Sequence, residues 1–220
     1  MKKKLIIFGV SQIAELASVY FEKDSDYEIV AYTVDKAYIT TAIFLDKPVI
    51  SFDEINKSYD PKMHDMFIAL SYAKMNSIRE KKYDEAKKKG FSLATYISSK
   101  CTLLTDYPVG DNCFILENNT IQPFVKIGNN VTLWSGNHIG HHSVIGDHNF
   151  ISSHVVISGN CTIKNNCFIG VNATIHNDVL MEEKNLIAAG AIITSSTQSK
   201  QVFLPPKSTV FKKLSDQLNF

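Results

Sequence analysis

The sequence predicts a small α/β domain followed by a long parallel β-helix. The first observation is a strict hydrophobic period of six, since every sixth residue from Ile97 to Ile193 is Ile, Leu, Val or Met. Neither helical spacing nor strand alternation gives this period, so each hexad must form one short strand and one corner of a coil. The second observation is that residues 1–96 alternate apolar runs with segments of helical spacing, which favours a small parallel sheet.

Length, composition and charge narrow the class of protein. The 220 residues leave room for one or two domains, with 45% hydrophobic and 20% charged residues, as in globular proteins. A net charge of +1 favours neither nucleic acid nor an anionic membrane as a partner. The apolar run that follows Lys2–Lys4 is too short for a signal peptide, and no stretch is apolar enough to cross a bilayer. We therefore expect a cytoplasmic protein without membrane insertion.

Residues 1–96 contain the alternating elements of the first domain. We expect strands over 4–8, 27–34 and 66–70, and a helix over 13–21. The run 48–52 leads into a short helix over 53–55. The charged segment 76–90 predicts a solvated helix that Asn76 caps and Gly90 ends. This alternation is typical of a doubly wound parallel sheet.

The coil occupies residues 97–198, and its hexads follow further rules. The fourth place mostly holds Asn, Asp or Gly, which tolerate the left-handed backbone of a tight corner. Three hexads make one triangular turn of 18 residues, so positions 18 apart stack, about 4.8 Å from each other. The four cysteines all occupy the fifth place, with small apolar residues elsewhere, which favours buried packing over a disulfide or metal site. Residues 199–220 leave the period, and 210–220 predict a short helix that caps the coil.

Three segments of the coil carry a resemblance to a known family. They are Gly136–Asp147 (GNHIGHHSVIGD), Asn166–Thr174 (NCFIGVNAT) and Ala188–Ala191 (AAGA). With the repeat Ile-Gly-x-Asn-small-x, they resemble the hexapeptide-repeat acyltransferases, which fold as left-handed parallel β-helices. The order of domains is similar to the sugar acyltransferases of the PglD/NeuD type, which carry a Rossmann-like domain before the coil.

The resemblance implies a function for each part of the chain. Residues 1–96 would bind a nucleotide sugar, residues 97–198 would form the acyltransferase coil, and residues 199–220 would be a tail. The reaction would transfer acetyl from acetyl-CoA to a nucleotide-linked 3-amino or 4-amino-4,6-dideoxy sugar for surface glycan biosynthesis. The subunits would form a homotrimer.

His141 and His142 are the expected catalytic residues. The resemblance puts the general base at His141, and an imidazole titrates in the range that this role requires. Many relatives have a carboxylate next, where this chain has His142, so a backbone carbonyl, Asp147 or a neighbouring subunit would have to orient the base. Two alternatives remain open. The histidines could simply be corner residues, or His141, His142 and His148 could bind zinc at a subunit boundary, as in γ-type carbonic anhydrases, although we expect no metal.

The resemblance also implies the binding residues, each of which could instead be an ordinary turn or packing residue. The substrate would contact Ser11, Gln12, Asp35 and Ser71, and CoA would contact Phe150, Val171, Ala188, Ala189 and Lys207. The first strand-to-helix turn is a poor dinucleotide fingerprint, because Ser11 and Ile13 stand where glycines are needed. Alternative functions are O-acetylation of a sugar or sialic acid, and a non-catalytic scaffold.

Overall fold

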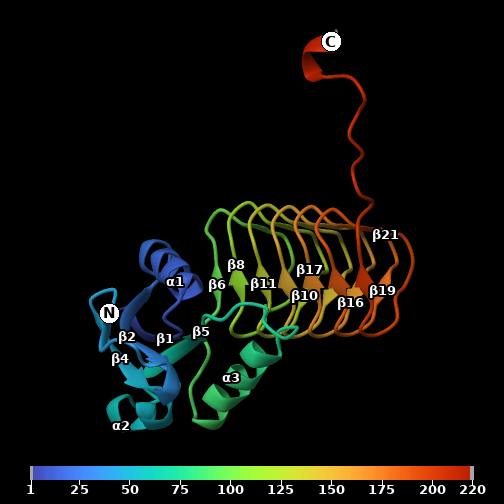
Figure 1. Cartoon of the computed structure of the whole chain (residues 1–220). Coiled ribbons are helices and arrows are strands. Elements are labelled where there is room, and N and C mark those ends of the chain that lie inside the picture. Colours follow the sequence, from blue (N-terminus) through green and yellow to red (C-terminus); the bar gives the residue numbers. More distant parts are fainter. Residues whose placement is uncertain (1, 219–220) are drawn as a thin grey trace.

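An α/β domain adjoins one end of a β-helical coil in the computed structural model, which describes residues 2–218 (Figure 1). The domain has a five-stranded sheet in the order β3-β4-β2-β1-β5. Its strands are β1 (Lys3–Phe8), β2 (Tyr27–Val34), β3 (Ile43–Phe44), β4 (Lys47–Ser51) and β5 (His64–Ile68). All neighbours pair in parallel except β3, an antiparallel edge strand that the sequence did not predict.

Helices cover both faces of this sheet, which confirms the doubly wound prediction. Side chains alternate along β1, so Leu5 and Ile7 pack with α1 (Gln12–Lys23) on one face. Ile6 and Phe8 pack on the other face with α2 (Ile55–Ser58) and α3 (Ser77–Lys88). Two 3-10 turns, η1 (Lys36–Tyr38) and η2 (Phe52–Glu54), follow the carboxyl ends of β2 and β4.

The prediction of a solvated, Asn76-capped helix over 76–90 was wrong in two respects. One face of α3 is buried, including Arg79, Lys82 and Tyr83, because the helix packs beside the coil (Figure 1). Asn76 itself is buried, and its side-chain amide donates to the carbonyl of Cys167 in the coil. The charged sequence of α3 therefore supplies an interface between the two domains.

The coil is a left-handed parallel β-helix built from strands of two residues. Its three sheets have the orders β22-β20-β17-β14-β11-β8-β6, β21-β18-β15-β12-β9-β7 and β10-β13-β16-β19. We name them face one, face two and face three. Partner residues lie 18 positions apart, as Thr132, Phe150 and Phe168 do on face one. The strands are Tyr96–Ile97, Thr102–Leu103, Phe114–Ile115, Thr120–Ile121, Lys126–Ile127, Thr132–Leu133, His138–Ile139, Val144–Ile145, Phe150–Ile151, Val156–Ile157, Thr162–Ile163, Phe168–Ile169, Thr174–Ile175, Leu180–Met181, Leu186–Ile187, Ile192–Ile193 and Val202–Phe203 for β6 to β22.

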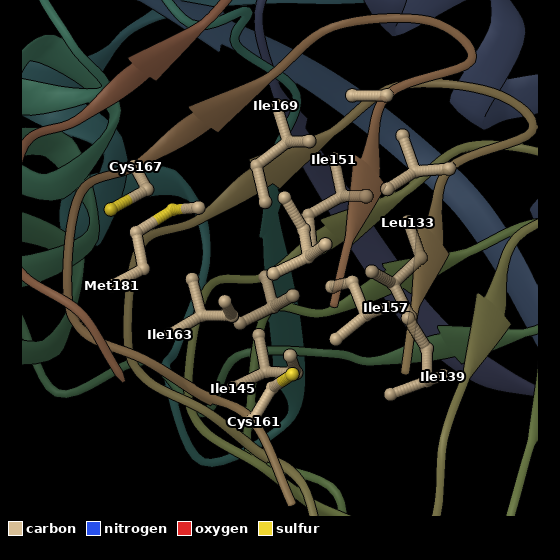
Figure 2. Close-up of a cluster of buried hydrophobic side chains, with 14 of the residues drawn as sticks. Leu133, Ile139, Ile145, Ile151, Ile157, Cys161, Ile163, Cys167, Ile169 and Met181 are labelled. Atoms are coloured by element: carbon tan, nitrogen blue, oxygen red, sulfur yellow. The ribbon is translucent and has the colours of Figure 1, made fainter. Parts of the chain in front are cut away.

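The first and fifth places of the hexads fill the interior of the coil (Figure 2). Residues such as Leu133, Ile151 and Ile169 have no exposed surface and stack in a column. Burial of each such side chain is worth roughly 1.5–3 kcal/mol relative to exposure. Cys161 and Cys167 belong to the same core as free thiols, which confirms the packing interpretation of the cysteines. Burial raises the pKa of the Cys167 thiol to about 11.

The corners confirm the prediction for the fourth place of the hexad. Every sixth residue from Asn112 to Gly190 has a φ between 53° and 80°. Most are Asn, Gly or His, the types that adopt this conformation at low cost. One predicted strand, at Val109, does not form in the described chain. Pro108 precedes it and lacks the N–H that a central strand would donate.

The expected cap of the coil also differs. After β22 the chain extends away from the coil (Figure 1), and Ser215–Gln217 form one exposed 3-10 turn, η3. Residues 219–220 of the predicted cap lie outside the described part. Within residues 2–218, every helix is too short or too polar to cross a lipid bilayer.

Candidate functional site

His141 and His142 lie at a corner between face two and face three, just after β12. Both side chains are exposed, and the backbone of His142 is left-handed with φ 59°. The Nδ1 atoms of the two imidazoles lie 3.2 Å apart, so one nitrogen donates to the other. The His142 ring also lies 4.6 Å, centroid to centroid, from that of Phe124, the corner residue one turn earlier. This corner therefore fixes the orientation of His141 through its own neighbour.

Two residues that the sequence analysis missed hold His141 in place. The backbone N–H of His141 donates to Oε1 of Gln122 at 2.9 Å. Gly159 stacks beneath His141, 18 residues later, and a Cβ atom there would lie 2.6 Å from Cε1 of the His141 ring. The imidazole thus rests on the backbone of the next turn, where only glycine leaves enough space. The stacking period of 18 could have found Gly159, because His141 and Gly159 share the third place of the hexad.

The predicted substrate residues follow neighbouring parallel strands of the α/β sheet. Ser11 and Gln12 begin α1 after β1, Asp35 follows β2, and Ser71 follows β5. Because β2, β1 and β5 are adjacent and parallel, these residues lie along one edge of the sheet, where α/β domains bind ligands.

Two details shape that edge. Gly9 has φ 130° and approaches β5 so closely that a Cβ would lie 2.9 Å from the carbonyl oxygen of Ala69. Asp35 accepts a 2.6 Å ion pair from Nζ of Lys82, which also contacts Glu85. The Asp35 carboxylate is therefore held by α3, while part of it stays exposed.

An open aromatic hollow lies where the α/β domain meets the coil. It is lined by Tyr72, Trp134, Phe150, Ser152, Ser153 and Val171. Tyr72 comes directly after Ser71, and its ring centroid lies 5.0 Å from Phe150 and 4.4 Å from Phe168. The hollow therefore joins the edge that carries Ser71 to Phe150 and Val171 of the predicted CoA site. Tyr72 and Trp134 were not predicted, because only the packing of the two domains brings them together.

The remaining predicted CoA residues lie near the corner between face one and face two. Val171 and Ala189 are 18 residues apart and stack there, and a Cβ on Gly170 would lie 2.5 Å from the backbone nitrogen of Ala189. Ala188 is half-buried beside Ala189. Lys207 is exposed in the segment that leaves the coil. His141 belongs to a different corner, at the other side of face two, so one chain does not bring His141 and the predicted CoA residues together.

His148 lies at the third corner, against α3 rather than beside His141. Its Nδ1 accepts a hydrogen bond from the amide of Asn130, and its Nε2 is 3.8 Å from Oε1 of Glu80. Burial lowers the pKa of His148 below its usual value near 6.5, although Glu80 opposes the shift. Within residues 2–218, no group of three or more His, Cys, Asp and Glu side chains is arranged to hold a metal ion.

The coil matches a family model and the whole chain matches solved structures. The model of the bacterial transferase hexapeptide repeat matches residues 109–141 and 125–159. The chain is similar to the acetyltransferase domain of PglB from Neisseria gonorrhoeae, with TM-score 0.80, 20% identity, and coverage of 93% of this chain and 100% of that domain. The same domain in complex with acetyl coenzyme A gives TM-score 0.78, 18% identity, and coverage of 94% and 100%.

A third similar structure is PerB from Caulobacter crescentus in complex with CoA and GDP-perosamine. It gives TM-score 0.78 at 17% identity and covers 90% of this chain and 92% of that one. No curated protein sequence matches the chain. At these identities the likeness establishes a shared two-domain fold that carries hexapeptide repeats.

Proposed function

We propose that this hexapeptide-repeat chain is an acetyl-CoA-dependent N-acetyltransferase that acts on a nucleotide-linked aminodeoxy sugar. The observation that carries the proposal is the exposed His141 imidazole, held by Gln122, His142 and Gly159 at a corner of a coil. The fold likeness adds support, because PglB is described with acetyl coenzyme A and PerB with CoA and GDP-perosamine.

In the proposed reaction, the amine nitrogen of the sugar attacks the thioester carbon of acetyl-CoA. A C–N bond forms, the C–S bond breaks, and CoA leaves as its thiol. His141 accepts the proton that the amine loses, directly or through water, and a backbone N–H stabilises the oxyanion. Because Nδ1 of His141 is tied to His142, Nε2 is the atom that accepts this proton. His142 is a positioning residue.

Each substrate has its own part of the molecule. Ser11, Gln12, Asp35 and Ser71 would bind the nucleotide sugar at the carboxyl edge of the sheet. Phe150 and Val171 in the aromatic hollow, with Ala188 and Ala189, would line the CoA arm, and Lys207 would meet its phosphates. Phe150 cannot form a hydrogen bond, so its part in the site is apolar contact.

We further propose a homotrimer with sites shared between subunits. The separation of His141 from Val171 and Ala189 across face two supports this, because a neighbouring copy could bring the two corners together. Exposed apolar side chains on face two, including Val156 and Ile192, are 39% and 62% accessible in the single chain. Free buried cysteines suit the cytoplasm, where acetyl-CoA and nucleotide sugars for surface glycans are made.

The test is a thiol-release assay with acetyl-CoA and UDP-, GDP- and dTDP-linked 3-amino and 4-amino sugars. We expect turnover with one of these amines and none with free sialic acid, whose nucleophile is a hydroxyl. We expect His141→Ala to lose about 10²–10⁴-fold in kcat. Turnover of sialic acid alone would instead support the O-acetyltransferase, and an unimpaired His141→Ala variant would remove His141 as the base.

A further inference from the structure

Arg79 is a buried cation at the junction of the two domains. Its guanidinium is 1% exposed and donates to Oγ1 of Thr132, Oδ1 of Asn76 and the carbonyl oxygens of His148 and Asn149, at 2.7–3.2 Å. Burial lowers the pKa of Arg79 to about 10, so the group remains charged at neutral pH. Four neutral acceptors, three of them in the coil, therefore hold one fixed positive charge on α3.

Two buried N–H groups at this junction are not paired with protein. Among residues 2–218, neither Nε of Arg79 nor Nε1 of Trp134 meets an acceptor. An unpaired buried donor costs about 1–3 kcal/mol, and native proteins rarely leave one without an explanation. Arg79 belongs to the α/β domain and Trp134 to the coil, so both unpaired donors lie at the same interface.

Both side chains line one enclosed cavity between the domains. Its walls include Ile68 and Leu70 from the end of β5, and Phe114 and Phe150 from face one. The space open to the centre of a water molecule is about 10 Å³, which is close to the minimum room that one water needs. The cavity therefore suits a single small acceptor and is far too small for a sugar or a phosphate.

The same cavity offers an acceptor for a donor inside it. Ile68 lies on the outer edge strand β5, and its N–H donates at 2.8 Å to Oδ1 of Asn112 in the coil. Ala69 bonds to Phe8 of β1, so its neighbour Ile68 directs both backbone groups away from β1. The carbonyl oxygen of Ile68 thus faces the coil on the side of the cavity.

We propose that this cavity binds one ordered water molecule that fastens the α/β domain to the coil. The water accepts hydrogen bonds from Nε–H of Arg79 and Nε1–H of Trp134, and donates one to the carbonyl oxygen of Ile68. Three bonds are the usual number for a buried water. A chloride ion would match the charge of Arg79, but it is larger than water and would face the Ile68 carbonyl without a proton to donate.

A high-resolution crystal structure of the full chain, from chloride-containing solution, tests the site directly. We expect one spherical density peak within hydrogen-bond distance of both nitrogens, with no anomalous signal at a long wavelength where chloride scatters. A chloride signal, absence of the peak, or protein acceptors on both nitrogens would overturn the proposal.

Trp134 gives a second readout in solution because it is the only tryptophan of the chain. With ¹⁵N-labelled tryptophan, its single indole N–H signal should show a rotating-frame cross-peak to a long-lived water. Substitution of Trp134 by 3-benzothienylalanine keeps the ring volume and replaces N–H by sulfur. We expect the unfolding temperature to fall, because the water loses a donor. A rise would mean that the indole N–H is truly unpaired and would contradict the bridging water.

Discussion

The contact between His141 and His142 sets the chemistry that the proposed base can perform. A neutral imidazole at position 142 can orient His141 through Nδ1, but it lacks the full negative charge by which a carboxylate would stabilise an imidazolium. The base in this chain is therefore positioned by its neighbour without being made more basic by a charge. This distinction is open to measurement, since charge and orientation affect different parts of a pH–rate profile.

We predict that His142→Glu moves the acid limb of the kcat/KM profile to higher pH. A carboxylate beside His141 favours the protonated imidazole, so a higher pH is needed to free the base. His142→Asn is the matched control, since Asn tolerates the left-handed backbone at this corner and stays neutral. If the acid limb lies at the same pH in both variants, residue 142 does not act on the base.

We also predict that His148 makes the folded state sensitive to acid. Its pKa in the folded chain lies below the usual 6.5 because of burial, so the unfolded chain binds the proton first as the pH falls. This part of the stability is complete above pH 6.5 and is lost progressively below it. Urea unfolding of His148→Asn should show less loss of stability in acid than wild type does. His176→Asn, at an exposed position, is the control, and equal acid sensitivity of all three proteins would contradict the prediction.

At the scale of elements, the stacking of turns decides where a side chain can rest. Gly159 leaves room for the His141 ring, so we predict that Gly159→Ala displaces the imidazole and lowers kcat. The test is a double-mutant cycle with His141→Ala. Gly159→Ala should reduce activity in the wild-type background and have little further effect when His141 is already absent. An equal loss in both backgrounds would mean that the substitution acts through the fold and not through His141.

Much of the coil could be predicted because one rule repeats. The period of six fixed which residues point inward, and the fourth place of each hexad gave the left-handed corners from Asn112 to Gly190. The rule failed at Val109, where Pro108 disrupts the strand. A period describes residues near each other in the coil, so it also located His141 at an exposed corner.

Contacts between the two domains were not predictable in the same way. The α3 sequence is so charged that it suggested a solvated helix, yet Arg79 is buried because acceptors of the coil surround it. Tyr72 and Trp134 meet at the aromatic hollow although 62 positions separate them in the sequence. No local pattern contains such a contact, so this part of the site required the structure.

At the scale of the whole molecule, the proposed trimer can be tested by mixing subunits. One variant is His141→Ala, and the other is Ala189→Trp, whose large side chain would obstruct the predicted CoA corner. Each should be nearly inactive alone. If sites form between subunits, mixed trimers made by co-expression contain some sites with an intact His141 from one chain and an intact corner from another, and activity returns. Mixtures as inactive as their components would indicate that each chain holds a complete site.

The register of 18 residues from turn to turn has an evolutionary consequence. Each turn bonds only to the turn before and the turn after it, and its hydrogen bonds are the same along the coil. Duplication or loss of one complete turn would therefore lengthen or shorten the prism by about 4.8 Å while every face keeps its direction. Genes for such chains can vary in steps of 54 nucleotides, which gives this architecture a ruler for setting the reach of its surface.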